Sequence, residues 1–262
     1  MKRIMALILL ITVSLLSSCS KPLTQLEQIQ ADETLRVITR ASPTTYYKRG
    51  TEYTGLELDL AKRFAKHLGV QLEISVADNL ATLLRHVEQG HVDIAAAGLT
   101  ITDDREDLVR FGPVYQEVRQ QLVYRQGNKR PEDLTEVDNG IVEVVADSSH
   151  VEQLKHLKQE VPKLEWSENT VLTSNQLLEL VQLELLDYTV ADSNEITASR
   201  NLFPELRVAF NISDPQPLAW TLALSDDESL YNEVIIFFEQ LTASGSLDRL
   251  IEKYYGHIRR FD

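Results

Sequence analysis

The feature that most constrains the fold is a regular alternation of strand-like and helix-like segments within the first hundred residues. Residues 35–39 are β-prone, residues 70–76 alternate in hydropathy like a strand, and residues 92–97 are apolar enough for a buried strand. Between these runs lie two segments with apolar residues at steps of three and four, which end at Gly69 and Gly90. This order predicts an α/β domain with a mostly parallel sheet.

The second half of the chain repeats part of the first. Residues 83–97 (LLRHVEQGHVDIAAA) and 177–191 (LLELVQLELLDYTVA) share leucine, valine, aspartate and alanine positions at a constant offset of 94. Further strands are expected at residues 141–145 and around Leu164, with a helix over residues 151–157. The chain is therefore expected to form two similar α/β lobes.

Ligands of such sheets bind beyond the carboxyl ends of the strands. The internal repeat consequently directs attention to residues 98–100 in one lobe and 192–193 in the other.

The N-terminus has the pattern of a secretory signal. Lys2 and Arg3 precede an apolar run over residues 4–16, which is too short to cross a bilayer as a helix. We therefore expect residues 1–18 to be a signal peptide.

The residues Leu-Ser-Ser-Cys that follow look like a bacterial lipobox, in which Cys19 receives lipid and becomes the mature N-terminus. The alternative is a signal peptide with an incidental cysteine. Ser20, in place of Asp, resembles an outer-membrane sorting signal, and residues 19–33 would form a lipid-anchored polar tether.

Composition excludes several classes of function. The chain has 40 Asp and Glu against 26 Lys and Arg, a formal charge of −14, which disfavours binding to nucleic acid. One cysteine cannot make an internal disulfide, and the six histidines show no zinc-ligand spacing. We expect no metal and no cofactor.

Seven segments, in order, resemble the family 3 solute-binding proteins, which are two-lobed periplasmic receptors for amino acids. They are LRVITRASPTTYY, YTGLELDLAKRFAKHLGV, HVDIAAAGLTITDDRED, FGPVYQEVRQQLVY, VVADSS, LDYTVADS and GSLDRLIEKYYG. The resemblance implies a type II periplasmic-binding-protein-like fold with two hinge crossings. Lobe I would comprise residues 34–117 plus 218–262, and lobe II residues 118–217.

One branch is favoured within that family. The segments GPVYQEVRQQLVYRQGNKRP, LDYTVADS and FPELRVAFNISDPQPLAW resemble the N-terminal sensor module of the membrane-bound lytic murein transglycosylase F family. There the module precedes a lysozyme-like domain that cleaves peptidoglycan to 1,6-anhydromuropeptides. The resemblance implies an envelope lipoprotein, most simply on the outer membrane facing the periplasm.

The strongest candidate for ligand binding is Arg105. The spacing Gly98-x-Thr100-x-Thr102-x-x-Arg105 matches the receptor pattern in which the arginine holds a ligand carboxylate. A guanidinium offers two parallel donors to such a group. Gly98 would allow close backbone approach, and Thr100 could donate to the same carboxylate. The alternative is a surface arginine paired with a neighbouring acid.

Further candidates follow from the same resemblance. Asp192 corresponds to the acid that accepts a ligand α-ammonium, although an Asp after a strand also commonly caps a helix. Ser148 and Ser149 occupy the turn that meets the ligand carboxylate, where Asp147 replaces the usual glycine.

Tyr46 and Tyr47 replace an aromatic residue that stacks on the ligand, with core packing as the alternative. No catalytic residue is expected. Glu228-Ser229 superficially resembles the start of a transglycosylase motif, but it lies in a highly charged helix start without the companion signatures.

Three functions compete at this point. The first is a sensor that binds an amino acid or murein-derived peptide and regulates a murein transglycosylase. The second is a solute-binding lipoprotein that delivers amino acids to an ABC transporter. The third is an enzyme on the receptor fold, such as a dehydratase.

Overall fold

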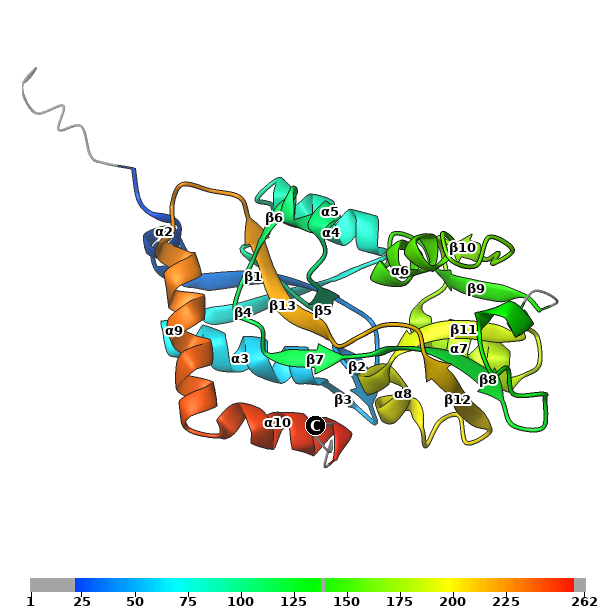
Figure 1. The fold of residues 1–262 in the computed structure, drawn as a ribbon. Helices are drawn as coiled ribbons and strands as arrows, with labels where there is room; N and C mark the ends of the chain where they lie inside the picture. Colours follow the sequence, from blue (N-terminus) through cyan, green and yellow to red (C-terminus); the bar gives the residue numbers. More distant parts are fainter. Residues whose placement is uncertain (1–21, 138–139, 257–262) are drawn as a thin grey trace, which may run out of the picture.

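The structure is a computed structural model that describes residues 22–137 and 140–256. The predicted signal peptide and the lipidation site Cys19 lie outside the described residues. The chain forms two lobes, each built on a sheet with helices on both faces (Figure 1). This is the two-lobed α/β arrangement that the sequence predicts.

The sheet of lobe I has the order β4-β1-β5-β13-β6, with β7 also paired to β13. Strand β1 is parallel to β4 and β5, whereas β13 returns from the far part of the chain and is antiparallel to its neighbours. The strands span Thr34–Arg40 (β1), Gln71–Ala77 (β4), Ile94–Thr100 (β5), Val109–Phe111 (β6), Gln116–Val118 (β7) and Gln216–Ala223 (β13).

Both faces of this sheet are covered by helices. Four helices pack on one face, and α4 covers the other through Leu83 and Val87. As predicted, α3 ends at Gly69, which adopts the left-handed conformation with φ +74°. The helices are α2 (Gln25–Ala31), α3 (Leu56–Leu68), α4 (Leu80–Glu88), α9 (Ser229–Ala243) and α10 (Ser246–Tyr255), with the short α5 (Asp103–Glu106) near the strand ends.

The prediction of a polar tether over residues 19–33 is wrong for its second part, because α2 is packed on the body of lobe I. Ile29 is only 2% exposed within the apolar core. The backbone N–H groups of Gln25 and Leu26 donate to Asp227 and Ser229, at 2.5 and 3.1 Å. The buried side chain of Ile29 and hydrogen bonds to residues at the start of α9 therefore hold this segment on lobe I.

The sheet of lobe II has the order β10-β9-β11-β8-β12, with β8 antiparallel to both β11 and β12. Helix α6 covers one face, and α7 and α8 cover the other. The elements are β8 (Gln120–Arg125), β9 (Val142–Val145), α6 (Ser149–Leu157), β10 (Ser167–Asn169), α7 (Ser174–Gln182), β11 (Tyr188–Asp192), α8 (Ser193–Ser199) and β12 (Leu206–Asn211), with a 3-10 turn over Leu134–Val137.

The internal repeat corresponds to equivalent elements of the two lobes. Helices α4 and α7 begin and end 94 residues apart, and each leads into a central strand, β5 or β11. The strand expected around Leu164 instead begins three residues later, at Ser167. Leu164 lies in the loop that precedes β10 and is buried in the lobe II core, which explains its apolar character.

The chain crosses between the lobes twice. Strand β7 ends at Val118 and β8 begins at Gln120 in the other sheet, while the return runs from Asn211 in β12 to Gln216 in β13. The crossings are tied together, since the backbone of Gln120 is hydrogen-bonded to Ser213 Oγ and to the N–H of Ile212. Two adjacent crossings of this kind permit hinge motion between lobes.

Candidate functional site

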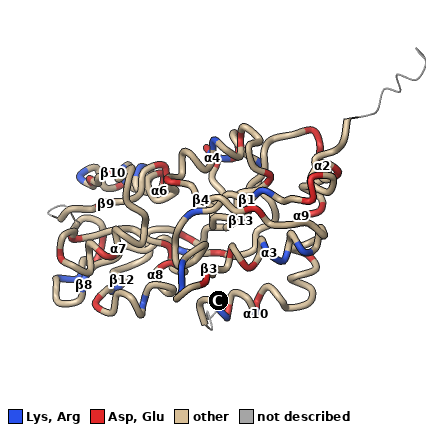
Figure 2. Tube along the Cα trace, turned by 180° about the vertical axis from the view of Figure 1, so that it is seen from behind, with Lys and Arg blue, Asp and Glu red and all other residues tan. Residues whose placement is uncertain are grey.

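The candidate site lies where strand ends of the two lobes meet. Charged residues are distributed over both lobes (Figure 2), but several become buried at this junction. Thr100 ends β5 in lobe I and Asp192 ends β11 in lobe II, as the strand-end argument predicts. Both side chains are almost inaccessible to solvent.

Arg105 connects the two lobes. The residue is 4% exposed, and its guanidinium donates from Nη1 to the carbonyl of Thr100 at 3.0 Å and from Nη2 to the carbonyl of Asp147 at 3.1 Å. The alternative of a surface arginine is therefore wrong. Burial lowers the pKa of Arg105, and the carboxylates of Glu152 and Asp192 oppose that effect.

The loop that carries Ser148 and Ser149 faces lobe I. Ser149 Oγ donates to Thr100 Oγ1 at 3.2 Å across the junction. Ser148 Oγ donates within lobe II, to the carbonyl of Val145. Asp147 has φ +58°, so it adopts the left-handed conformation that a glycine would take more easily.

Asp192 has two partners in its own lobe. Its side chain accepts a hydrogen bond from the backbone N–H of Glu195 at the start of α8, and Oδ1 lies 3.1 Å from His150 Nε2. The helix-capping interpretation of Asp192 is therefore correct, and its contact with a ligand stays a prediction. Sequence reasoning did not identify His150, which is 5% exposed.

A second charged pair spans the junction. Arg40, the last residue of β1, places Nη2 3.1 Å from Glu195 Oε1 of lobe II and donates from Nε to the carbonyl of Ala97 at 2.8 Å. Glu195 Oε2 also accepts from Ser174 Oγ at 2.8 Å. The sequence offered one signal for Arg40, a charge directly at the carboxyl end of a predicted strand.

The backbone of Gly98 forms a hydrogen bond to the buried carboxylate of Glu57. Gly98 has φ +61°, and its N–H donates to Glu57, which also accepts from Trp220 Nε1 at 2.7 Å and from the hydroxyl of Tyr115. Burial raises the pKa of Glu57, and these donors oppose the rise. Glu57 therefore fixes the strand end beneath the junction.

Several buried polar atoms at the junction have no hydrogen-bond partner within the described part of the chain. They come from both lobes and from the first crossing, and they belong mostly to neutral amide or imidazole groups. They are Arg105 Nε, Gln116 Nε2, Gln120 Oε1, His150 Nδ1, Asn194 Oδ1 and Glu195 Oε1, the last of which lies within ion-pair distance of Arg40. Buried polar groups are normally paired, so such a cluster indicates a place for an external partner.

A cavity of about 180 Å³ adjoins this cluster. Four segments that follow strands line it, residues 40–42 and 77–81 of lobe I and residues 145–147 and 169–174 of lobe II. Arg40 belongs to its wall, but none of the site residues predicted from the sequence does. Of those residues, Arg105, Thr100 and Ser149 take part in the polar contact between the lobes.

Tyr46 is not part of that cavity wall. Its ring stacks on Tyr53 of the small hairpin formed by β2 (Tyr47–Arg49) and β3 (Glu52–Thr54), with centroids 4.6 Å apart. The intramolecular stacking matches the packing alternative, although the ring is half-buried and could also contact a ligand.

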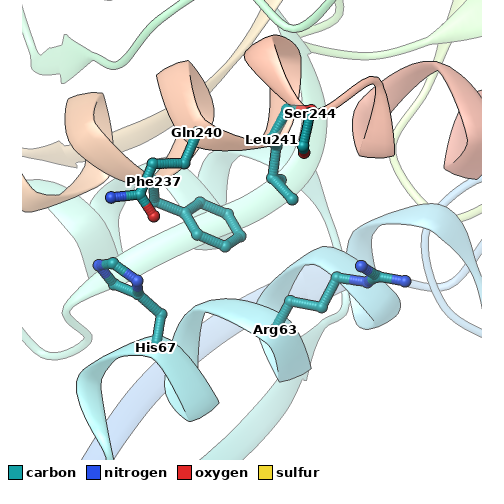
Figure 3. A pocket seen from close by; sticks show the side chains of 6 residues that line it. All are labelled: Arg63, His67, Phe237, Gln240, Leu241 and Ser244. Carbon is teal, nitrogen blue, oxygen red and sulfur yellow. The ribbon is translucent and has the colours of Figure 1, made fainter.

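Another hollow, of about 370 Å³, lies between α3 and α9 on the helical face of lobe I. Figure 3 shows Arg63 and His67 on one helix opposite Phe237 and Leu241 on the other. His67 is paired with Glu233, at 2.6 Å. None of the residues that line this hollow carries a buried polar atom without a hydrogen-bond partner, so we do not assign a ligand to it.

Two other kinds of site find no support. Residues 22–137 and 140–256 contain no group of three metal-ligating side chains, and none of their helices is long and apolar enough to span a bilayer. Glu228 is largely exposed at the start of α9 and pairs with Arg110 at 3.1 Å. A general acid for glycoside cleavage needs an apolar site instead.

Comparison with sequence families gives one match over most of the chain. The family model for bacterial extracellular solute-binding proteins, family 3, matches residues 35–257. Two curated relatives are the membrane-bound lytic murein transglycosylase F 1 of Alkalilimnicola ehrlichii, 44% identical over 243 residues, and the transglycosylase F of Saccharophagus degradans, 41% identical over 239 residues. The alignments cover 92% and 91% of this chain but only 49% and 48% of the relatives. The chain therefore spans about half their length.

Solved structures share the fold. A mutant of the arginine-binding protein ArgBP from T. maritima superposes with a TM-score of 0.78 at 21% identity, covering 88% of this chain and 99% of that one. The substrate-binding protein AbpA from Streptococcus pneumoniae, bound to L-arginine, gives 0.77 at 21% identity, covering 87% and 97%. These are amino-acid-binding proteins with the type II arrangement of lobes.

Proposed function

The chain belongs to family 3 of the bacterial extracellular solute-binding proteins, and from that premise we propose that it is the sensor module of a membrane-bound lytic murein transglycosylase F-type lipoprotein. The module binds an amino acid or a short murein-derived peptide between its lobes. The main support is the buried guanidinium of Arg105, which bridges the lobes next to a group of unpartnered polar atoms.

Each predicted residue has a place in this proposal. Arg105 and Thr100 meet the ligand carboxylate, since a carboxylate can accept from a guanidinium and a hydroxyl at once, and Ser149 donates to Thr100 Oγ1 and so orients that hydroxyl. Asp192 faces the ligand nitrogen. Gly98, Ser148 and Tyr46 shape the surrounding loops.

Regulation would follow from closure of the lobes. A ligand that contacts both lobes binds the closed state better than the open one and shifts the population toward it. The transglycosylase activity named for the relatives would reside in a further domain. Lipid on Cys19 would hold the module in the cell envelope, with the outer membrane as the expected location.

Delivery of amino acids to an ABC transporter is not favoured. The relatives at 38–44% identity carry the transglycosylase name, whereas the amino-acid-binding structures quoted above are 21% identical. Their similarity establishes the fold alone.

A melting-temperature screen tests the proposal. Free amino acids and peptides released from murein are added to the full chain, and at least one is expected to raise the melting temperature through preferential binding to the folded state. Asp192→Ala should abolish that rise, while the control Arg110→Ala, in an exposed ion pair, should retain it. If no compound stabilises the wild-type chain, the proposal fails.

A further inference from the structure

The most extensive contact between elements of the two lobes is made by two helices. Within residues 22–137 and 140–256, no helix or strand of one lobe packs more extensively on an element of the other than α8 of lobe II does on α10 of lobe I (Figure 1). Ala198 of α8 packs against the apolar core of lobe I, to which Leu250 and Tyr255 of α10 belong. The end of α10 therefore meets the opposite lobe.

The last turn of α10 is fastened to lobe I. Asp59 Oδ2 of α3 accepts hydrogen bonds from Lys253 Nζ at 2.6 Å and from the hydroxyl of Tyr254 at 2.7 Å. Tyr255 is 5% exposed, and its hydroxyl donates to the carbonyl of Thr44, in the loop after β1, at 3.5 Å. Because these partners all belong to lobe I, α10 moves with that lobe.

Helix α8 moves with lobe II and brings a charge to the same place. Ile196 packs in the lobe II core, while Glu195 Oε1 lies 3.1 Å from Arg40 Nη2 of lobe I. Burial raises the pKa of Tyr255 well above its ordinary value, and the carboxylates of Glu57 and Glu195 raise it further. The buried tyrosine of α10 thus lies close to the ion pair that joins the lobes.

The end of α10 is consequently held by lobe I on one side and covered by lobe II on the other. We propose that the contact between α8 and the last turn of α10 reports lobe closure. Closed lobes cover Tyr255 and hold the last turn, and opening withdraws α8 and lets that turn fray. The inference rests on the proposed function and assigns its regulation to one pair of helices, since a domain that follows α10 would receive this change.

Hydrogen exchange of the full chain, followed by mass spectrometry without ligand, tests this coupling. Arg105→Ala removes the hydrogen bond to the carbonyl of Asp147 in the other lobe, and α5, which carries Arg105, lies at the opposite edge of the molecule from α10 (Figure 1). The lobes should open more often, so exchange in residues 250–256 should become at least about threefold faster. The matched control Arg36→Ala removes an arginine that pairs with Asp93 inside lobe I, and it should leave these residues unchanged.

A second pair of variants probes the contact from the side of α10. Coupling between two sites is reciprocal, so a change at the end of α10 should be felt in α8. Tyr255→Ala removes the buried ring and should make exchange in residues 193–199 at least about threefold faster. Tyr255→Phe keeps the ring and should exchange at the wild-type rate in the same residues.

The outcomes distinguish this inference from the proposed function. Unchanged exchange at the end of α10 in Arg105→Ala overturns the coupling. Equal acceleration in Arg36→Ala overturns it too, because the effect would then be a general loss of stability. Since no ligand is present, neither result bears on ligand binding, which the melting-temperature screen tests separately.

Discussion

Two buried polar regions of this molecule differ in how their groups are partnered. Around Glu57, within lobe I, the carboxylate accepts from Tyr115, Trp220 and the backbone of Gly98. At the lobe junction, partners come from both lobes, and six buried side-chain atoms have no hydrogen-bond partner among the described residues. Burial of polar groups alone therefore does not mark a binding site. The groups of the first region satisfy one another within one lobe, whereas those of the second leave room for the ligand that we propose.

The largest expected effect is on the complete network. Glu57→Ala leaves the Tyr115 hydroxyl and the Trp220 indole N–H buried without their acceptor. Each stranded donor costs about 1–3 kcal/mol, so the unfolding free energy should fall by about 3–5 kcal/mol with the cavity included. Urea denaturation measures this change. A loss below about 1 kcal/mol would mean that the network does not stabilise lobe I.

A smaller loss is expected where α2 joins lobe I. Ile29→Ala removes a side chain that is 2% exposed and should cost about 2–4 kcal/mol. Gln30→Ala, on the exposed side of the same helix, is the matched control and should stay within about 0.5 kcal/mol. Equal stabilities for the two variants would restore the tether interpretation of this segment.

The ion pair across the junction should contribute less. A double-mutant cycle with Arg40→Met and Glu195→Gln should give a coupling energy of about 0.5–3 kcal/mol, because the two side chains lie 3.1 Å apart and are mostly buried. Thermal or urea unfolding of the four proteins supplies the values. Strict additivity would show that Arg40 and Glu195 do not interact in solution.

The raised pKa of Glu57 also predicts that the stability of the folded chain depends on pH. The pKa of this carboxyl group in the folded chain is raised above 4.5, so the unfolded chain loses this proton first as pH rises. The contribution of Glu57 to stability is therefore full below pH 4.5 and declines as pH rises toward the folded pKa. Glu57→Gln carries no such proton, and wild type should lose stability relative to this variant over that window. A constant difference from pH 4 to 8 would contradict the raised pKa.

Local pattern accounts for much of the fold. The three- and four-residue spacing in α3 and the glycine that ends it are readable without tertiary information, as is the offset of 94 that relates α4 to α7. Helix α2 was missed because seven mostly polar residues carry little periodicity, although Thr24 and Glu27 form a capping box. Its backbone is hydrogen-bonded to Asp227 and Ser229, at and just before the start of α9, about 200 residues away.

The site was predictable in part. Arg105 and Thr100 were identified by motif spacing, but the partners of Asp192 and Arg40 were not. Arg40 and Glu195 are 155 positions apart, and only the meeting of two strand ends brings them together. The sequence did not single out His150, because Asp192, whose carboxylate it contacts, lies 42 positions further along the chain.

The most direct test is calorimetry of the best-binding ligand with wild type, Arg105→Ala and Arg110→Ala. Truncating one partner of a desolvated charge pair costs about 2–5 kcal/mol, which corresponds to binding weakened about 30-fold to several thousand-fold. We expect that loss for Arg105→Ala and unchanged affinity for Arg110→Ala. If Arg105→Ala binds as tightly as wild type, the ligand is not held at the lobe junction by this guanidinium, and the account of the site is wrong.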